Sequence, residues 1–443
     1  MRVAIVSKEG TSLPWWKRLQ DEGHDVAVWI KDVGPRQTGD GIIPKAGSWP
    51  TLLEWAKVGQ RVGQKTIVFF DFSGLGELAE HARDSGLAVV GGCKFADRLE
   101  KDRLFGFDIA KSIGCKLPKY EWFESFDACL RYARKMSDKA VYFKSNRFIG
   151  SDATHGCATA AEMVEYLEWL IRNHGGAGAC MLQDKVEGVA VSTARWWNGR
   201  SWVGPYEGTI EHKPFMNGDV GPGTGCAINT VWFYESENPY IAREQGWDRL
   251  ASVFTKYNAA PGIYDINSVV APNGDTYFLE WTPRLGYDSE MTSFRLFPDL
   301  GKVLHTVAYG TGDLEPSSEI AYATRVTVPP YPWDGADKNH NKTCVGTYIS
   351  QDDAVGDLWS GGFVASGVRI KDGILEVAVP DGYVGVAYGQ SRSFKMAVER
   401  AEKAAKALMM PGKQYRTDGF KTLVKDAKKA RSAGLELPPG MVD

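Results

Sequence analysis

The stretch GIYDINSVVAPNGDTYFLEWTPRLGYDSE, residues 262–290, carries the most informative pattern in the chain. Two apolar runs, at 263–271 and 276–281, flank the dipeptide Asn273-Gly274, which is typical of a tight turn between antiparallel strands. The two-residue period of a strand places Asp265 and Asn267 on one face, and the turn brings Glu280 beside them. The stretch therefore predicts a β-hairpin that holds three oxygen-bearing side chains close together.

These three side chains are of the kind that binds a hard divalent cation. Carboxylate and amide oxygens are ligands of Mg²⁺ or Mn²⁺, and such an ion commonly bridges nucleotide phosphates. Arg284 follows Glu280 by four residues and has the planar fork that suits a phosphoryl oxygen. We interpret Glu280, Asp265 and Asn267 as a metal site. A surface hairpin with an incidental glutamate is the alternative interpretation.

The first 92 residues alternate between strand and helix patterns. Apolar runs predict strands at 3–6, 26–30, 66–72 and 87–90, and helical spacing predicts helices at 15–22 and 76–84. Strands that alternate with helices favour a parallel sheet covered on both faces. We therefore predict a Rossmann-like α/β domain over residues 1–95.

An α+β region is predicted to follow. Helices are expected at 99–113 and 127–137, and a third begins at Thr159, which forms a capping box with Glu162. Strands are expected at 140–144, 180–186, 189–196, 203–206, 323–328, 367–371, 374–378 and 385–388, before a helix at 394–409. The predicted domains are 96–318, with a small lid at about 118–188, and 319–443, an α+β domain with a basic helical tail.

Three further segments combine polar side chains with backbone that could face a ligand. Lys144 ends a buried strand, where a lysine needs an anion, and the loop that follows, with Gly150 and Gly156, offers N–H groups to phosphate. The stretch 180–188 runs from a strand into a polar sequence suited to pair with a purine edge, although it is equally an edge strand. In EHKPFMNGDVGPGTG, residues 211–225, we predict a glycine-rich ligand-facing loop.

The composition excludes several classes of protein. The 443 residues carry 52 Lys+Arg against 55 Asp+Glu, a net charge of −3, without the basic excess of a general nucleic-acid-binding protein. Between residues 395 and 431 there are eleven Lys/Arg and four Asp/Glu, which we interpret as a solvated helical face rather than a nucleic-acid contact. The 7 cysteines form no CxxC pair, and no apolar run reaches the ~18 residues of a membrane span. A cytoplasmic protein is expected.

Taken in chain order, these segments resemble the ATP-grasp ligases, and among them the phosphoribosylamine–glycine ligases. LEKDRLFGFDIAKSIGCKLPKY, residues 99–120, is similar to a helix and the "IP-T-x-Y" stretch of that family. EHKPFMNGDVGPGTG resembles "DHKR…D-x-GPNTGGMG", and YFLEWTPRLGYDSE, residues 277–290, resembles the metal-binding "EFN-x-RFGDPE". GVAYGQSRSFKMAVERAEKAAKAL, residues 385–408, and the later YRTDG, residues 415–419, continue the resemblance to the family's C-terminal "Y-R-x-DIG".

The resemblance implies an ATP-grasp fold of α/β and α+β type, with a Rossmann-like N-terminal domain and a small C-terminal α+β domain. It also implies an ADP-forming, magnesium-dependent ligase of the purine-biosynthesis kind, which activates a carboxylate as an acylphosphate and joins it to an amine. The implied ATP contacts are Arg103, Lys144, Gln183, Asp184, Lys185 and Val186. Glu280 would bind magnesium and Arg284 would clamp a phosphate. The implied acceptor side consists of His212, Lys213, Asp219, Gly223 and Thr224, and the implied catalytic side chains are Arg284, Lys144 and Asp219.

The chain also departs from the family pattern. The family's "GGREHA" loop, which suits a sugar phosphate, is replaced by SKEGTSLPWW, residues 7–16, and the asparagine of "EFN" by Thr282. We therefore expect a small carboxylate substrate, glycine or another amino acid, and an altered amine acceptor, nucleotide-linked or not. The alternatives are an authentic phosphoribosylamine–glycine ligase and a non-catalytic nucleotide-binding protein on the same fold. An acceptor amine on nucleic acid, steered by the basic tail, is a further alternative.

Overall fold

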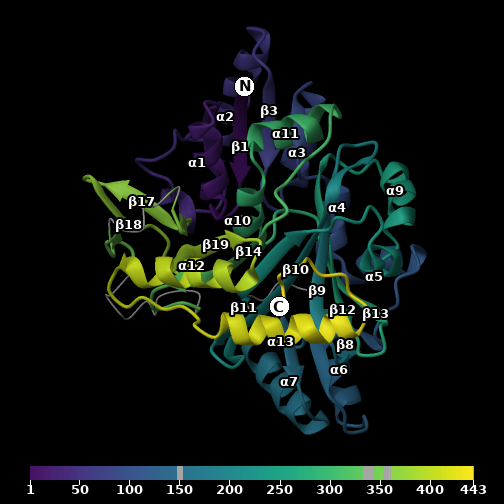
Figure 1. Ribbon diagram of the computed structural model, residues 1–443. Coiled ribbons are helices and arrows are strands. Elements are labelled where there is room, and N and C mark those ends of the chain that lie inside the picture. The colour runs from purple at the N-terminus through teal and green to yellow at the C-terminus, as the bar shows by residue number, and fades with distance from the viewer. Residues whose placement is uncertain (147–152, 333–343, 353–358, 360, 443) are drawn as a thin grey trace.

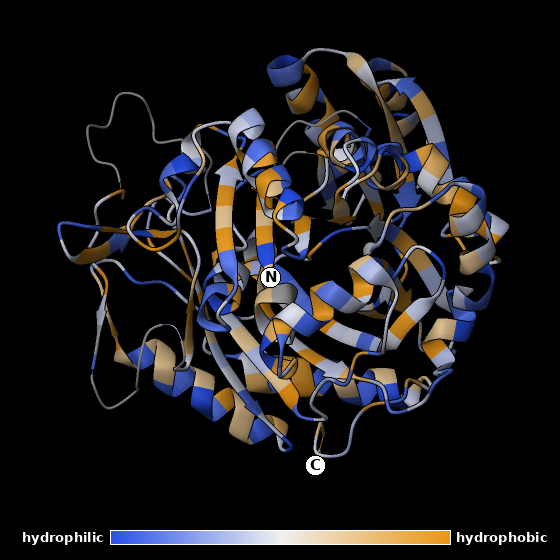
Figure 2. Cartoon of the chain, turned by 90° about the horizontal axis from the view of Figure 1, so that it is seen from above, coloured by the Kyte–Doolittle hydropathy of each residue, from blue (hydrophilic) through white to orange (hydrophobic). Residues whose placement is uncertain are grey.

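Figure 1 shows the computed structural model of the chain, with two smaller sheets on opposite sides of a large central one. The structure describes residues 1–146, 153–332, 344–352, 359 and 361–442. Half of the predicted phosphate loop, residues 147–152 with Gly150, therefore lies outside the described residues, whereas Gly156 lies in a strand paired with Tyr142 and not in a loop. Within the described part of the chain, every helix is too short or too polar to cross a bilayer. Figure 2 shows hydrophobic and hydrophilic residues alternating in bands along the helices and strands.

The N-terminal sheet is parallel, as predicted, with the strand order β2-β1-β3-β4. Its strands are β1 (Arg2–Ser7), β2 (Asp25–Ile30), β3 (Thr66–Phe70) and β4 (Ala88–Val90), and its helices are α1 (Leu13–Asp21), α2 (Trp49–Arg61) and α3 (Gly76–Asp84). Val3 and Ile5 pack with α1, whereas Ala4 and Val6 pack with α2 on the opposite face. Alternate residues of one strand thus bury both faces of the sheet, which is why the four central residues of β1, 3–6, are all apolar.

The single helix predicted at 99–113 is wrong, because the chain forms two helices there. They are α4 (Lys94–Lys101) and α5 (Arg103–Ser112), separated by Asp102 in an extended conformation with φ −98° and ψ 93°. The carboxylate of Asp102 accepts a hydrogen bond from the backbone N–H of Phe105 at 3.2 Å, which satisfies one of the unpaired donors at a helix start. The break places Arg103 at the first position of α5.

We expect Asp102→Ala to destabilise the protein by about 1 kcal/mol, because α5 loses its N-cap. Thermal unfolding of this variant should be compared with that of Asp108→Ala, which removes the same charge from an exposed position within α5. An equal effect of the two substitutions would show that charge, rather than the cap, explains the loss.

The predicted lid forms a separate sheet with the order β5-β8-β6-β7. Its elements are β5 (Tyr120–Ser125), α6 (Phe126–Ala133), β6 (Val141–Ser145), β7 (Thr154–Cys157), α7 (Ala160–His174) and β8 (Ala177–Asp184). The predicted capping interaction is confirmed at α7, where the Thr159 hydroxyl accepts from the backbone N–H of Glu162 at 3.2 Å. In return, the Glu162 carboxylate accepts from the backbone N–H of Ala158 at 2.7 Å, one residue earlier than in the usual box.

The central sheet has the strand order β13-β12-β9-β10-β11-β14-β19-β16. Its strands are β9 (Val189–Trp197), β10 (Trp202–Met216), β11 (Val220–Phe233), β12 (Gly262–Val270), β13 (Thr276–Thr282), β14 (Ile320–Thr327), β16 (Phe363–Ala365) and β19 (Tyr383–Ser391). The predicted hairpin is confirmed as β12 and β13. Strands from both predicted later domains share this one sheet.

The glycine-rich loop predicted at 211–225 is wrong, because most of it forms a two-stranded ribbon. Strands β10 and β11 pair from Glu207 and Phe233 out to Met216 and Val220, with register shifts on either side of Pro214. Only residues 217–219 form the turn between the two strands. Backbone pairing between the two strands holds this segment in an extended conformation. The glycine content of the segment gives no indication of that pairing.

The remaining elements lie outside these three sheets. They are α8 (Tyr240–Glu244), α9 (Trp247–Lys256), α10 (Ser289–Ser293), α11 (Leu300–Tyr309), α12 (Phe394–Ala407) and α13 (Gly419–Ser432), the strands β15 (Ser350–Gln351), β17 (Val368–Lys371), β18 (Ile374–Val377) and β20 (Leu408–Met409), and the short turns η1 (Gly34–Gln37) and η2 (Phe294–Leu296). Helix α13 packs across β9, β10 and β11 (Figure 1). It buries Leu423 and Ala427 and exposes Lys421, Lys425 and Lys428, so the basic residues do lie on an exposed helical face.

Candidate functional site

A cluster of three cations and one carboxylate forms where the lid meets the central sheet. Lys144, at the end of β6, is 5% exposed, and its Nζ donates to the backbone oxygen of Leu279 in β13 at 3.3 Å. Burial, together with the charges of Arg103 and Lys213, lowers the pKa of Lys144 to about 7, although Glu280 opposes this shift. An anion brought next to Lys144 would favour the charged form of this lysine.

Glu280, on β13, is the negative centre of the cluster. Lys213 Nζ lies 3.4 Å from its Oε1, and Arg103 Nη1 lies 3.9 Å from its Oε2. Burial would raise the pKa of Glu280, but the charges of Lys213, Lys144 and Arg103 lower it to about 2. The side chains of Glu280 and Lys213 are 38% and 48% exposed, so the cluster is open to solvent on their side. The carboxylate is therefore ionised at neutral pH and accessible to a ligand.

Arg103 links three elements at this point. Its Nε donates to the backbone oxygen of Ser145 at 2.8 Å, and its backbone N–H donates to the side chain of Asn146 at 2.9 Å. Both contacts depend on the helix break at Asp102, because that break places Arg103 at the start of α5. The predicted role of Arg103 at ATP phosphates stays a prediction, but the structure does bring it beside Lys144 and Glu280.

The predicted metal ligands lie beside one another on the hairpin. Asn267 is directly opposite Glu280 in the β12–β13 register, and its amide nitrogen donates to Thr282 at 3.0 Å and to Asp265 Oδ2 at 3.4 Å. Both of these contacts use the amide nitrogen of Asn267 and neither uses its oxygen. An ionised carboxylate beside an amide oxygen is a donor set that fits a hard divalent cation. Elsewhere in the described residues, Glu22, His24 and Asp299 lie within reach of one ion, but Glu22 already accepts from two backbone N–H groups of α11.

The predicted adenine hinge lies at the end of β8 and continues beyond it. Gln183 is buried within the lid sheet between β5 and β6. The backbone N–H of Asp184 donates to Lys119 at 2.8 Å, and that of Lys185 donates to Ala140 at 3.1 Å. These two amides are therefore not available to a purine edge. Any hinge contact from the predicted stretch would come from Val186 or from backbone oxygens.

Arg284, the predicted phosphate clamp, is bound to a carboxylate that the sequence analysis did not single out. Its Nη2 and Nε lie 2.8 Å and 3.0 Å from Oε1 of Glu100. The guanidinium also lies over the rings of Phe72 and Tyr287, at 4.5 Å and 5.0 Å from their centroids. Burial would lower the pKa of Arg284, but Glu100 and Tyr287 outweigh burial and raise the pKa above its ordinary value. Its charge is thus largely neutralised within the protein.

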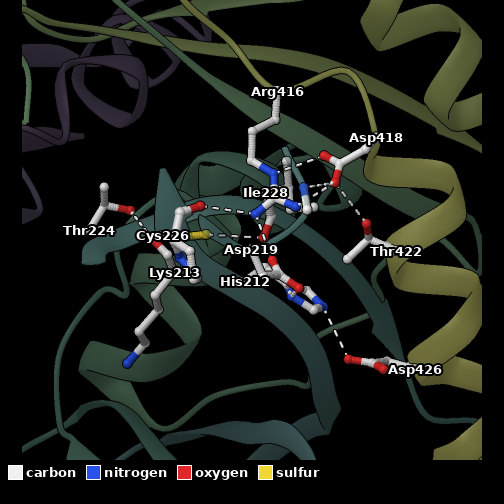
Figure 3. Close-up of polar contacts among 12 residues, drawn as sticks. His212, Lys213, Asp219, Thr224, Cys226, Ile228, Arg416, Asp418, Thr422 and Asp426 are labelled. Carbon is white, nitrogen blue, oxygen red and sulfur yellow. Dashed lines mark hydrogen bonds and ion pairs between the residues drawn. The ribbon is translucent and has the colours of Figure 1, made fainter. Parts of the chain in front are cut away.

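His212 and Asp219, predicted on the acceptor side, lie in a polar network with the C-terminal tail (Figure 3). His212 lies between two carboxylates, with Nδ1 3.0 Å from Asp219 and Nε2 3.1 Å from Asp426 in α13. Although burial disfavours the imidazolium, Asp426 and Asp219 raise the pKa of His212. Buried Arg416 donates to Asp219 at 2.8 Å and forms a two-pronged contact with Asp418. The network holds the ribbon turn against the tail.

The remaining predicted acceptor residues lie on the ribbon near Lys213. The hydroxyl of Thr224 donates to the backbone oxygen of Lys213 at 2.7 Å. Gly223 is opposite Pro214, and a Cβ built on it would meet no atom within 4 Å. Glu100, Asp418 and Asp426 were not among the predicted site residues; for Asp418, its place beside Arg416 in the YRTDG motif was an available signal.

Comparison with known proteins supports the resemblance noted from the motifs. No sequence profile of a known protein family matches the chain. It is 25% identical over 154 residues to phosphoribosylamine–glycine ligase of Halalkalibacterium halodurans, and 26% identical over 156 residues to that of Rhodopirellula baltica. These matches cover 34% and 33% of this chain and 36% of each relative. The similarity thus spans about a third of the curated relatives' length.

The similarity of structure extends much further along the chain. Phosphoribosylamine–glycine ligase of Thermotoga maritima aligns over 94% of this chain and 100% of that one, with a TM-score of 0.72 and 20% identity. A biotin carboxylase from Campylobacter jejuni aligns over 93% of this chain and 92% of that one, with a TM-score of 0.60 and 13% identity. At these identities the likeness establishes the fold. The chain has the ATP-grasp fold, and in sequence and structure it resembles the phosphoribosylamine–glycine ligases.

Proposed function

We propose that the protein is an ATP-dependent, ADP-forming ligase that joins a carboxylate to an amine through an acylphosphate. The observation that carries this proposal is the cluster of Arg103, Lys144 and Lys213 around Glu280. Transfer of a phosphoryl group depends mainly on neutralising and positioning its charge, and less on an acid or a base. Three cations around one ionised carboxylate, open to solvent on one side, match that requirement.

Each member of the cluster has a distinct role in this proposal. The carboxylate oxygen of the substrate attacks the γ-phosphorus of ATP, the bond to the β-phosphate oxygen breaks, and ADP leaves. Lys144 and Arg103 would hold the transferred group, and Lys213 would orient the substrate carboxylate. Glu280 and Asn267 would hold Mg²⁺, which supplies further positive charge to the phosphates when bound. The amine then attacks the acyl carbon, phosphate leaves, and the amine loses its proton.

The relatives indicate only the chemical class of each substrate. The name phosphoribosylamine–glycine ligase refers to an amine and a small amino acid, so the carboxylate substrate we propose is glycine or another small amino acid. The loop at residues 7–16 differs from the family's sugar-phosphate loop, which supports an altered acceptor. The alignment over the whole length of the Thermotoga maritima enzyme favours authentic glycinamide ribonucleotide synthesis as the second candidate.

The proposal is tested by following ADP and phosphate while the protein is supplied with ATP, Mg²⁺ and panels of amino acids and amines. ADP formation that requires both a carboxylate and an amine is expected. Turnover restricted to glycine with phosphoribosylamine would establish the second candidate instead. ATP binding without turnover on any pair would contradict both and identify a non-catalytic nucleotide-binding protein.

We expect Glu280→Gln to raise the Mg²⁺ concentration needed for half-maximal ADP formation by about tenfold or more, because a charged ligand becomes neutral. The matched control is Glu187→Gln, which changes an exposed glutamate paired with Lys185. Chelation of Mg²⁺ should abolish turnover in both variants. An unchanged Mg²⁺ dependence in Glu280→Gln would remove Glu280 from the metal site.

A further inference from the structure

Asp71 directly follows β3, at the carboxyl edge of the N-terminal sheet. In the strand order β2-β1-β3-β4, β2 lies on one side of β1 and β3 lies on the other. The order therefore reverses between β1 and β3, and the carboxyl ends of these two strands border that switch point of the sheet. In open α/β sheets, ligands commonly bind at that point. Asp71 is 1% exposed and lines a cavity of about 10 Å³ together with Thr11, Phe72, Tyr287 and Tyr383. That volume is close to the space of one water molecule or one ammonium group.

The carboxylate of Asp71 lacks a charged partner within the described part of the chain. The groups that face it are the hydroxyls of Ser7 and Ser12 and the indole N–H of Trp16, all of which are neutral. Burial raises the pKa of Asp71 to about 7, and these neighbours only partly offset the shift. A buried carboxylate in this state costs stability, which makes a purely structural role a poor explanation.

The charges around the cavity do not suit a phosphate. Lys8 is paired with Glu9, and Arg284 is paired with Glu100. Asp288, also in the cavity wall, is already bound by Arg325 at 2.6 Å and by the Tyr383 hydroxyl at 2.8 Å. With these pairs formed, Asp71 is the acidic residue of the cavity wall that has no charged partner among the described residues, and a cation beside it would favour its ionised form.

The cavity is linked to the proposed reaction centre by side-chain contacts and by charge interactions. Tyr287, in the cavity wall, donates to Glu9 at 3.1 Å, and its ring lies under the guanidinium of Arg284. Arg284 contacts Glu100, and the charges of Glu280 and Glu100 both favour the charged form of Arg103. A Cβ on Gly225 of the ribbon would come within 2.9 Å of the Tyr287 ring, so the ribbon also borders this wall.

We propose that Asp71 binds a cationic group of the acceptor, so that the amine substrate carries a second, positively charged amino group instead of a phosphate. This inference rests on the proposed ligase function and names the chemical class of its acceptor. A cation in the cavity would supply the charge that Asp71 lacks, and the tail of the substrate would run past Tyr287 toward the cluster around Glu280. Trp15 and Trp16 are buried in the core, so they do not themselves line an acceptor surface.

The test uses three small primary amines whose second polar group is positive, neutral or negative: 1,3-diaminopropane, ethanolamine and O-phosphoethanolamine. Calorimetry should show 1,3-diaminopropane binding at least about tenfold more tightly than O-phosphoethanolamine. Asp71→Asn should remove that preference, whereas Asp25→Asn, which makes the same change at the opposite edge of the sheet, should keep it. Binding of O-phosphoethanolamine as tightly as the diamine, or an unchanged preference in Asp71→Asn, would overturn the proposal.

Two further measurements keep this test independent of folding and of the ligase proposal. Asp71→Asn should melt at a temperature no lower than the wild type, because it removes a buried carboxylate, so lost binding cannot be ascribed to unfolding. Hydroxylamine traps an acylphosphate as a hydroxamate without any acceptor. Hydroxamate from wild-type protein, ATP and a carboxylate would support the ligase function even if the diamine fails to bind, and its absence would contradict that function whatever the amine result.

Discussion

Lys144→Met is expected to reduce ATP turnover by about a hundredfold or more, because the transferred phosphoryl group loses a preorganised cation in a largely buried site. Lys144 is the least exposed member of the cluster, and its pKa of about 7 shows that the surroundings hold its charge weakly until an anion is present. A bound triphosphate would supply that anion and raise the pKa again. The measurement is the rate of ADP formation at saturating ATP, Mg²⁺ and substrates.

The control for this prediction separates catalysis from folding. Methionine is unbranched and apolar, so at a buried position it should keep or raise the melting temperature. Lys135→Met changes an exposed lysine of the lid and should leave turnover close to wild type. If Lys144→Met turned over ATP as fast as Lys135→Met, the cluster would not be the phosphoryl-transfer site.

Arg416→Met is expected to destabilise the protein by about 3 kcal/mol, because it leaves Asp219 and Asp418 without the buried cation that binds both. The same change releases the ribbon turn, where Gly218 donates its backbone N–H to Asp418 at 2.8 Å. Thermal or urea unfolding at pH 7 measures the loss. Arg416→Lys, which keeps the charge but not the two-pronged geometry, should recover part of it.

The loss of stability in Arg416→Met should depend on pH in a definite direction. Burial would raise the pKa of Asp418, but its contacts with Arg416, the backbone N–H of Gly218 and the Thr422 hydroxyl lower it from 3.8 to about 2. A carboxylate with a lowered pKa stabilises the folded state above its unfolded pKa, and the contribution, about 2 kcal/mol here, is lost as the pH falls from about 4 to 2. Arg416→Met lacks, at every pH, the part of this contribution that Arg416 supplies. The stability difference between the two proteins should therefore narrow in acid, and a constant difference would contradict the assignment.

The hairpin at 262–290 and the parallel N-terminal sheet could be predicted because their signals are local. Asn273-Gly274 specifies a tight turn, and the alternation along β12 fixes which side chains share a face, so Asp265, Asn267 and Glu280 were correctly placed together. The helix at 99–113 could not be divided correctly, because its apolar spacing continues across Asp102. The extended backbone of Asp102 and its capping hydrogen bond to Phe105 show that a new helix begins there.

Local sequence patterns are sufficient to predict which neighbours along a strand or helix share a face, because that relation follows from backbone periodicity. The three-dimensional fold is needed to see that Arg103, Lys144, Lys213 and Glu280 form one cluster, that Glu100 neutralises Arg284, and that Asp71 is buried without a charged partner. These outcomes depend on contacts between segments tens to hundreds of residues apart. Their energies come from packing and desolvation in the folded protein, which no local pattern encodes.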